Sequence, residues 1–341
     1  KTIDASTALS LIIRAGAGVN TIDLEEASRR GIYVANCPGE NTQAVAELVI
    51  GLMIAVDRRI VDAATELKNG TWNKKEYSKA PGLAGRTLGI LGLGSIGKAV
   101  ARAAHGLKMD VIAWSRSFSP EMEIDLGIGY VDSPHKVAEK SDVVSVHLAA
   151  APETKQLCDE NFFNRMKDGA MFINASRGDI VDSAALKRAI QEKSLRVALD
   201  VYENEPGSGQ ADFADTELMQ HIIGTPHIGA STDQAAEAIA AAVVRIVQNY
   251  KETGQPNNVV NIRPQLSDRP VMVVRHFNKV GVLAHVLSEI RNEGINVEDM
   301  GNTIFKGGAA AVATLKMDKD PSENLLTQLR NKENVVEVTL K

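Results

Sequence analysis

The stretch TLGILGLGSIGKAVA, residues 87–101, decides which fold this chain can adopt. The run TLGIL has the apolar character of a short buried strand, and the residues after Gly94 have helical periodicity. Gly92, Gly94 and Gly97 stand between them in the spacing G-x-G-x-x-G. The first glycine permits a tight turn, the second lets a pyrophosphate approach the backbone, and the third lets helix pack on strand. The stretch therefore predicts a strand–turn–helix unit whose helix N-terminus binds a dinucleotide.

The same alternation continues along the chain. Further strand-like runs, most of them separated by helical segments, are DVIAW, DVVSVHL, AMFINAS, RVALDV and IIGT. Strands alternating with helices predict an α/β fold with a doubly wound parallel sheet of the Rossmann type. The upstream runs LSLIIRAGAGVN and SRRGIYVANCPG also suggest α/β structure, whereas the polar residues 65–85 suggest a crossing between domains. A long Ala-rich helix is expected to end at Gly254.

The tail has a different pattern. We expect a linker at residues 257–268, and residues 269–341 predict strand, helix, strand, strand, helix and strand in that order. This βαββαβ order is typical of the ferredoxin-like fold. We therefore expect a separate small C-terminal domain.

Composition excludes several classes of function. The net charge of −5 gives no electrostatic reason to expect nucleic acid or a membrane surface as a partner. Only Cys37 and Cys158 are present, too few for a disulfide framework, so we expect a cytoplasmic protein. No apolar stretch approaches the ~20 residues of a membrane span. A small-molecule substrate and no metal are expected.

Three polar residues each stand just beyond a strand-like run: Arg177 in NASRGDIVD, Glu205 in ALDVYENEP and His227 in TPHIGAST. Ligands of open α/β sheets bind where strands end, so we expect the three side chains to converge. Histidine can exchange a proton near neutral pH, and a neighbouring carboxylate raises its pKa and fixes its tautomer. An arginine fork can hold a substrate carboxylate. With a dinucleotide site, the set predicts hydride chemistry on a 2-hydroxy or 2-oxo acid.

The end of the second strand leaves the cofactor open between NAD and NADP. An acid that binds the ribose hydroxyls is expected there in NAD sites, but the chain has Ser115 followed by Arg116. The missing carboxylate removes repulsion toward a 2′-phosphate, and Arg116 could pair with that phosphate.

At these residues the chain closely resembles the D-isomer-specific 2-hydroxyacid dehydrogenases. The matching stretches are RAGAGVNTIDL, NTQAVAELVIG, LGILGLGSIGKAVA, SDVVSVHLAAAPET, MFINASRGDIVD, ALDVYENEP and TPHIGAST. The resemblance implies that Arg177, Glu205 and His227 are the catalytic residues. It also implies cofactor contacts from Ser95, Ile96, His147, Ala175, Asp200 and Gly229, with Asp200 at the nicotinamide carboxamide. The implied substrate contacts are Arg14, Gly16, Asn41 and Arg177.

The resemblance implies a division into domains as well. Residues 1–55 and 230–262 are expected to form a split, flavodoxin-like substrate-binding domain, flanking a dinucleotide-binding domain at residues 56–229. The opening strand–helix–strand segment of the family does not precede Lys1, so we expect the substrate domain to be incomplete at its N-terminus. We also expect a homodimer or homotetramer.

The C-terminal residues RPVMVVRHFNKVGVLAHVLSEIRNEGINVEDM resemble an ACT domain, an amino-acid-sensing module. In regulated members of the family, serine binds between paired ACT domains. The matching residues here are His276, Asn278 and Asn296, which implies L-serine as an effector. The alternative is that these residues only shape a turn and that the module only dimerises.

This combination of domains is similar to the phosphoglycerate dehydrogenase branch of the family, which implies oxidation of 3-phosphoglycerate to 3-phosphohydroxypyruvate in serine biosynthesis. Two alternatives remain. The first is the same chemistry on glyoxylate or hydroxypyruvate, which Ser115 and Arg116 would suit if NADP is preferred. The second is a dinucleotide- and amino-acid-sensing regulator without turnover.

Overall fold

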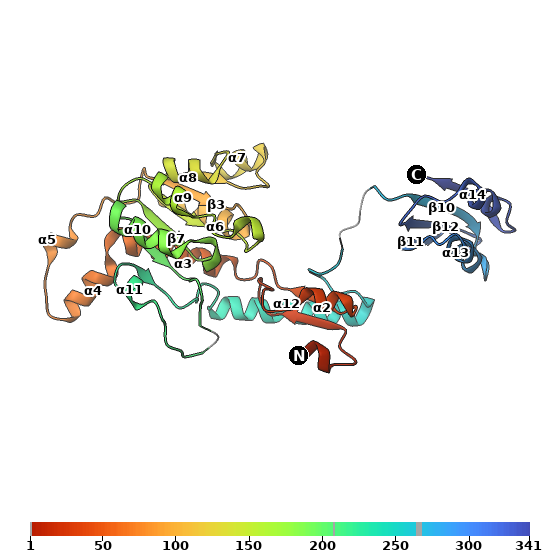
Figure 1. Cartoon of the computed structure of the whole chain (residues 1–341), viewed down its shortest axis with the longest axis horizontal. Helices are drawn as coiled ribbons and strands as arrows, with labels where there is room; N and C mark the ends of the chain where they lie inside the picture. Colours follow the sequence, from red (N-terminus) through yellow and green to blue (C-terminus); the bar gives the residue numbers. More distant parts are fainter. Residues whose placement is uncertain (1, 207–208, 264–267) are drawn as a thin grey trace. The chain divides into compact units, whose positions relative to one another are not determined.

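The chain forms two compact units, Lys1–Ile262 and Arg263–Lys341, in a computed structural model that describes residues 2–206, 209–263 and 268–341. Each unit has its own sheet and its own hydrophobic core. Figure 1 shows both units and labels many of their helices and some of their strands.

The first unit is built around a seven-stranded parallel sheet, in the order β5-β4-β3-β6-β7-β8-β9. The strands are β3 (Thr87–Leu91), β4 (Asp110–Trp114), β5 (Gly129–Tyr130), β6 (Val143–Val146), β7 (Met171–Asn174), β8 (Arg196–Leu199) and β9 (Ile223–Gly224). The strand order reverses between β3 and β6, which is where ligands bind in folds of this kind. The predicted Rossmann-type sheet is confirmed, with β5 as an additional short edge strand.

Helices cover both faces of this sheet, as a doubly wound fold requires. One face packs against α3 (Thr42–Arg58), α6 (Ser95–Gly106) and α7 (Pro120–Leu126). The other packs against α8 (Pro134–Lys140), α9 (Glu160–Arg165), α10 (Ser183–Lys193) and α11 (Thr216–Met219). Because side chains alternate along a strand, Met171 and Ile173 of β7 face the first group and Phe172 faces the second.

The helix α3 belongs to the core of the nucleotide-binding sheet. Its residues Val45, Val49, Met53 and Val56 pack in the same cluster as the β3 and β7 side chains. The predicted boundary between residues 55 and 56 falls inside this helix. Residues 65–85, expected as a polar crossing, include the end of α4 (Ile60–Lys68) and the one-turn helix α5 (Lys74–Tyr77).

A smaller α/β layer completes the first unit. The parallel strands β1 (Leu11–Arg14) and β2 (Tyr33–Asn36) lie between α2 (Leu24–Arg29) on one face and α12 (Asp233–Thr253) on the other. The short helix α1 (Thr2–Ala5) precedes them. As predicted, α12 ends at Gly254, which has a left-handed φ of 75°.

The second unit has the predicted βαββαβ order. Its elements are β10 (Val271–Phe277), α13 (Val282–Asn292), β11 (Val297–Ile304), β12 (Ala310–Met317), α14 (Glu323–Arg330) and β13 (Val335–Leu340). The antiparallel sheet has the order β11-β12-β10-β13, and the two helices pack on one face of it. Within the described parts of both units, no helix is long and apolar enough to cross a membrane.

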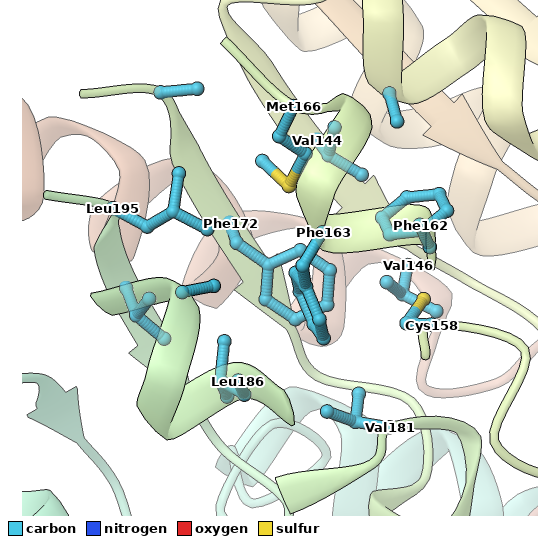
Figure 2. Packing of buried hydrophobic residues seen from close by; sticks show 14 of the residues in the cluster. Val144, Val146, Cys158, Phe162, Phe163, Met166, Phe172, Val181, Leu186 and Leu195 are labelled. Atoms are coloured by element: carbon cyan, nitrogen blue, oxygen red, sulfur yellow. The ribbon is translucent and has the colours of Figure 1, made fainter. Parts of the chain in front are cut away.

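The core beneath β7 is centred on three aromatic side chains, shown in Figure 2. Phe163 and Phe172 meet edge to face with ring centroids 5.1 Å apart, and Phe162 lies 5.7 Å from Phe163. All three are essentially inaccessible to solvent. They join α9 to the sheet and so stabilise the strand whose end carries Arg177.

We predict that Phe172→Ala lowers the free energy of unfolding by about 3–5 kcal/mol, because a large buried side chain leaves a cavity that the packed core cannot fill. Urea denaturation of the variant measures this loss. Trp72→Ala is the control, since that aromatic side chain is 79% exposed and should change stability little. Equal effects of the two substitutions would contradict the assignment of Phe172 to the core.

Candidate active site

The loops that follow β3, β4, β6, β7, β8 and β9 leave the same edge of the parallel sheet. Every predicted cofactor and catalytic residue lies on one of these loops or on the helix α6 that begins there. The sheet order places the loop after β3 beside those after β4 and β6. This edge is therefore the candidate active site.

The glycine loop has the geometry that a pyrophosphate requires. Gly92 has φ of +96°, and a Cβ there would lie 2.6 Å from the carbonyl oxygen of His147. A Cβ on Gly97 would overlap the carbonyl oxygen of Gly92, so both positions exclude a side chain. Gly94 is the N-cap of α6 and makes no side-chain cap bond, and among the described residues no atom beyond its chain neighbours lies within 4 Å of where its Cβ would be. The helix N-terminus is thus open to a phosphate group.

Ser115 and Arg116 lie beside this loop, since the N–H of Gly92 donates to the carbonyl oxygen of Trp114 at 2.9 Å. Ser115 is partly buried, and its Oγ lies 3.4 Å from Oγ of Ser117. Arg116 is exposed. The structure thus places a short polar side chain and an exposed arginine next to the glycine loop.

His147 presents an unpaired nitrogen near the same loop. Its Nε2 bonds Oγ of Ser145 at 2.8 Å, while its buried Nδ1 has no hydrogen-bond partner among the described residues. Burial lowers the pKa of His147 to about 4, so the ring is neutral at physiological pH. A buried polar atom without a partner fits a site that a polar cofactor completes. The sequence singled out His147 but not Ser145, which orients the ring.

His227 and Glu205 form the predicted pair. Nδ1 of His227 donates to Oε2 of Glu205 at 2.6 Å, and the N–H of Tyr202 donates to Oε1 at 2.9 Å. The bond to Glu205 raises the pKa of His227 and outweighs the opposite effect of partial burial. Burial acts to raise the pKa of Glu205, but its bonds with His227 and Tyr202 bring the pKa below the ordinary value. The contact leaves Nε2 of His227 available for proton transfer.

The turn that carries His227 is held by Asp200. Oδ1 of Asp200 accepts bonds from Oγ1 of Thr225 at 2.6 Å and from the N–H of Ile228 at 2.8 Å, and Oδ2 accepts from the N–H of Gly229 at 2.8 Å. His227 has a left-handed φ of 54°. The resemblance implied a nicotinamide contact for Asp200, and the structure adds a role in holding this turn. Sequence reasoning missed Thr225, although it lies in the same TPHIGAST stretch.

Arg177 follows a turn that Asn174 shapes at the end of β7. The buried Asn174 donates to the carbonyl oxygen of Arg177 at 3.0 Å and accepts from Oγ of Ser176 at 2.7 Å. Nη1 of Arg177 donates to the carbonyl oxygen of Ser176 at 2.6 Å. Neither Asn174 nor Ser176 was predicted, because a residue that shapes a turn carries no chemistry of its own.

The loop after β1 reaches Arg177 through Gly18, beside which the guanidinium lies. Arg14 in the same loop is exposed, and its Nη1 bonds the carbonyl oxygen of Ala15 at 2.8 Å. Gly16 has φ of +146° and accepts a bond from the N–H of Cys37 at 2.9 Å. The predicted substrate loop therefore contacts Arg177, the arginine predicted to be catalytic.

Asn41 and Gly229 lie at a second contact with the sheet edge. Asn41 is the N-cap residue of α3 and makes no side-chain cap bond. A Cβ on Gly229 would lie 3.6 Å from Val45 in the first turn of that helix. The beginning of α3 thus lies beside the His227 turn. Ser95, Ile96 and Ala175 occupy the start of α6 and the exit of β7, as predicted.

The predicted effector residues do not converge within the second unit. Asn278 follows the end of β10, where its Nδ2 donates to the carbonyl oxygen of Gly308 at 3.0 Å. The buried His276 bonds Oδ1 of Asn302 at 3.3 Å. Asn296 precedes β11 at the other end of β12, and its carbonyl oxygen accepts from the N–H of Asp318. Because β12 has 8 residues, the two ends lie roughly 26 Å apart.

No group of three or more His, Cys, Asp or Glu residues within 2–206, 209–263 and 268–341 could hold a metal ion. The predicted catalytic residues Arg177, Glu205 and His227 lie at the same sheet edge as the glycine loop.

Comparisons with known proteins agree with this arrangement. Residues 50–229 match the family model of the D-isomer specific 2-hydroxyacid dehydrogenase NAD binding domain. A glyoxylate reductase of Thermococcus litoralis is 39% identical over 260 residues, covering 74% of this chain and 77% of the relative. A crystal structure of a glyoxylate reductase from Paecilomyes thermophila has a TM-score of 0.69 at 32% identity, covering 76% of this chain and 77% of that one.

A D-3-phosphoglycerate dehydrogenase of Methanocaldococcus jannaschii is 35% identical over 316 residues. That match covers 92% of this chain but only 58% of the length of the relative. The family model alone spans more than half of the chain, on the segment that carries the glycine loop, Arg177, Glu205 and His227. The chain belongs to the D-isomer specific 2-hydroxyacid dehydrogenase family, whose NAD-binding domain it carries.

Proposed function

We propose that this protein is a D-2-hydroxyacid dehydrogenase that oxidises 3-phosphoglycerate to 3-phosphohydroxypyruvate. The observation that carries the proposal is the 2.6 Å bond between His227 and Glu205, at the sheet edge that also holds Arg177 and the glycine loop. A histidine with a raised pKa, a carboxylate behind it and a cation beside it are the groups that oxidation of a 2-hydroxy acid requires.

His227, Glu205 and Arg177 have different roles in this reaction. Nε2 of His227 accepts the proton of the 2-hydroxyl group, while Nδ1 remains bonded to Glu205, whose carboxylate stabilises the imidazolium that forms. Arg177 binds the substrate carboxylate and stabilises negative charge on the reacting oxygen. A bound nicotinamide supplies the hydride acceptor in this direction and the hydride donor in the reverse direction. Arg14 and Asn41 contribute further polar contacts to the acid.

The extent of similarity favours phosphoglycerate as the substrate. The match to the Methanocaldococcus enzyme runs over 316 residues, more than the first unit contains, so it extends into the C-terminal unit. The match to the Thermococcus glyoxylate reductase covers 260 residues, which the first unit alone can accommodate. The similarity to this relative, which is named for phosphoglycerate, therefore includes part of the βαββαβ unit of this chain.

Reduction of glyoxylate or hydroxypyruvate is the second candidate. The Thermococcus glyoxylate reductase is 39% identical to this chain, against 35% for the Methanocaldococcus phosphoglycerate dehydrogenase and 39% for that of Archaeoglobus fulgidus, so identity alone favours neither substrate. Ser115 and the exposed Arg116 leave room for a 2′-phosphate, so NADP is compatible with the site. The chemistry at His227 is the same for both substrates, and only the groups that surround the acid differ.

We further propose that the C-terminal unit is an ACT domain that binds L-serine between two copies of the chain. His276 and Asn278 lie at one end of the sheet and Asn296 at the other, so a small amino acid touches all three only if a second copy supplies one of them. His and Asn side chains provide the donors and acceptors that a zwitterion needs. This arrangement requires at least a homodimer.

Replacing Glu205 by Gln should move the pH profile of oxidation to lower pH. Oxidation needs neutral His227, and Glu205 raises the pKa of that histidine, so in the native protein kcat/KM rises only as pH passes through the raised pKa. Without the carboxylate, the rise occurs at lower pH, and reduction correspondingly loses activity at lower pH. Steady-state rates from pH 5 to 10 measure both limbs, and unchanged limbs would contradict the pairing.

We expect His227→Ala to lower kcat by about 10²–10⁴-fold, because the proton acceptor is lost. The full-length protein and the variant are assayed on 3-phosphoglycerate, phosphohydroxypyruvate, hydroxypyruvate and glyoxylate, with both NAD(H) and NADP(H). His221→Ala is the control, since that histidine is exposed and lies before β9. The substrate and cofactor with the highest kcat/KM decide between the two candidates, and undiminished turnover by His227→Ala would exclude the mechanism.

For the effector, we expect L-serine to inhibit the full-length protein and Asn278→Ala to relieve the inhibition without changing the uninhibited rate. Asn278 lies in the second unit, outside the catalytic machinery. Asn292→Ala at the end of α13 is the matched control and should leave inhibition intact. Calorimetric titration of L-serine checks binding separately, and no heat of binding to the native protein would end the proposal.

A further inference from the structure

Gly18 lies directly beside the guanidinium of Arg177. A Cβ built on Gly18 would overlap Nη2 of Arg177, at 3.5 Å from its Cζ, and would lie 3.3 Å from Oδ1 of Asn20. The guanidinium therefore occupies the space that any other side chain at position 18 would fill.

The backbone at this position does not itself require glycine. Gly16, two residues earlier, has φ of +146°, a conformation that L-residues rarely adopt. Gly18 is not among the glycines with positive φ, so its backbone accepts an alanine without strain. The constraint at position 18 is steric, and Arg177 makes the closest contact.

An added methyl group would move the arginine rather than the loop. The loop is fixed by bonds from the N–H of Cys37 to Gly16 at 2.9 Å and from Nδ2 of Asn36 to the carbonyl oxygen of Ala17 at 2.7 Å. Nη2 is the free end of a flexible side chain, so it gives way first. The fold therefore tolerates a methyl group at position 18, but the guanidinium of Arg177, which would bind the substrate carboxylate, is displaced.

We propose that Gly18 is a positioning residue for Arg177, and that the reaction rather than the fold requires glycine there. The empty position lets the guanidinium lie against the loop after β1, and thereby sets where the substrate carboxylate binds. This inference rests on the proposed function of Arg177 and extends it to a residue from a distant part of the chain.

The test compares Gly18→Ala with Gly51→Ala in the full-length protein. Gly51 lies inside α3, and within the described part of the chain no atom outside its own helix turn lies within 4 Å of its Cβ position, so alanine is accommodated there. Both variants should unfold near the native temperature and keep the native KM for the nicotinamide cofactor. Gly18→Ala alone should raise KM for the acid substrate by about 10–100-fold, since a displacement of about 1 Å at a positioning group has effects of this size.

Binding of oxalate, a non-reacting analogue of a 2-oxo acid, provides a readout without turnover. Calorimetry in the presence of NAD should show weaker oxalate binding to Gly18→Ala and native binding to Gly51→Ala. In an Arg177→Ala background, adding Gly18→Ala should change the oxalate Kd less than twofold, because the displaced group is already gone.

These measurements distinguish a failure of the positioning role of Gly18 from a failure of the proposed dehydrogenase function. Native oxalate affinity in Gly18→Ala, or an equal loss in the presence and absence of Arg177, overturns the positioning role. A native protein that turns over none of the four acids, yet binds oxalate more weakly after Gly18→Ala, overturns the proposed function and supports the positioning role. A large drop in the unfolding temperature of Gly18→Ala alone shows that the fold requires the glycine, and overturns the inference.

Discussion

The carboxylate of Asp200 holds together the two segments on which the active site depends. It is almost inaccessible to solvent, and a buried carboxylate is costly unless donors surround it. Here a hydroxyl group and two backbone N–H groups supply them, all from the turn Thr225–Gly229. That turn keeps His227 in a left-handed conformation, which costs about 1–3 kcal/mol and persists only where its surroundings enforce it. Asp200 thus couples the exit of β8 to the exit of β9.

The remaining contacts reinforce the same coupling. Tyr202 follows the same strand as Asp200, and its hydroxyl group donates to the carbonyl oxygens of Leu199 and Thr225 at 3.0 and 3.1 Å. The N–H of Tyr202 also donates to Oε1 of Glu205, whose Oε2 accepts the bond from Nδ1 of His227. The imidazole is therefore fixed through its backbone and through Nδ1, and Nε2 is the ring nitrogen that the contact with Glu205 leaves unoccupied. Gly92 and Gly18 contribute by lacking a side chain. The backbone of His147 lies where a side chain of residue 92 would be, and the guanidinium of Arg177 lies where a side chain of residue 18 would be.

Much of this arrangement could be predicted because it is local. A strand run, a glycine turn and a helix are neighbours in sequence, so TLGIL, Gly92 and α6 follow from periodicity and steric limits. The positions of Arg177, Glu205 and His227 followed from a property of parallel sheets, whose strands all end at one edge. Secondary-structure elements whose sequence shows no clear periodicity were not predicted. β5 has two residues, too few to show alternation, and α4 lies in a segment whose polar composition suggested a crossing.

The sequence by itself therefore determined the fold class and the family, and it pointed to the glycine loop and to Arg177, Glu205 and His227 as candidate site residues, because each depends on residue types at short spacing. Only the tertiary structure decided how those residues are held. Asp200 and Thr225 are 25 positions apart, and Gly18 and Arg177 lie in loops that follow strands of different sheets. Asn278 and Asn296 lie at opposite ends of one sheet despite their closeness in sequence. Contacts of this kind depend on where loops return after a strand or a helix, and residue spacing carries no information about that path.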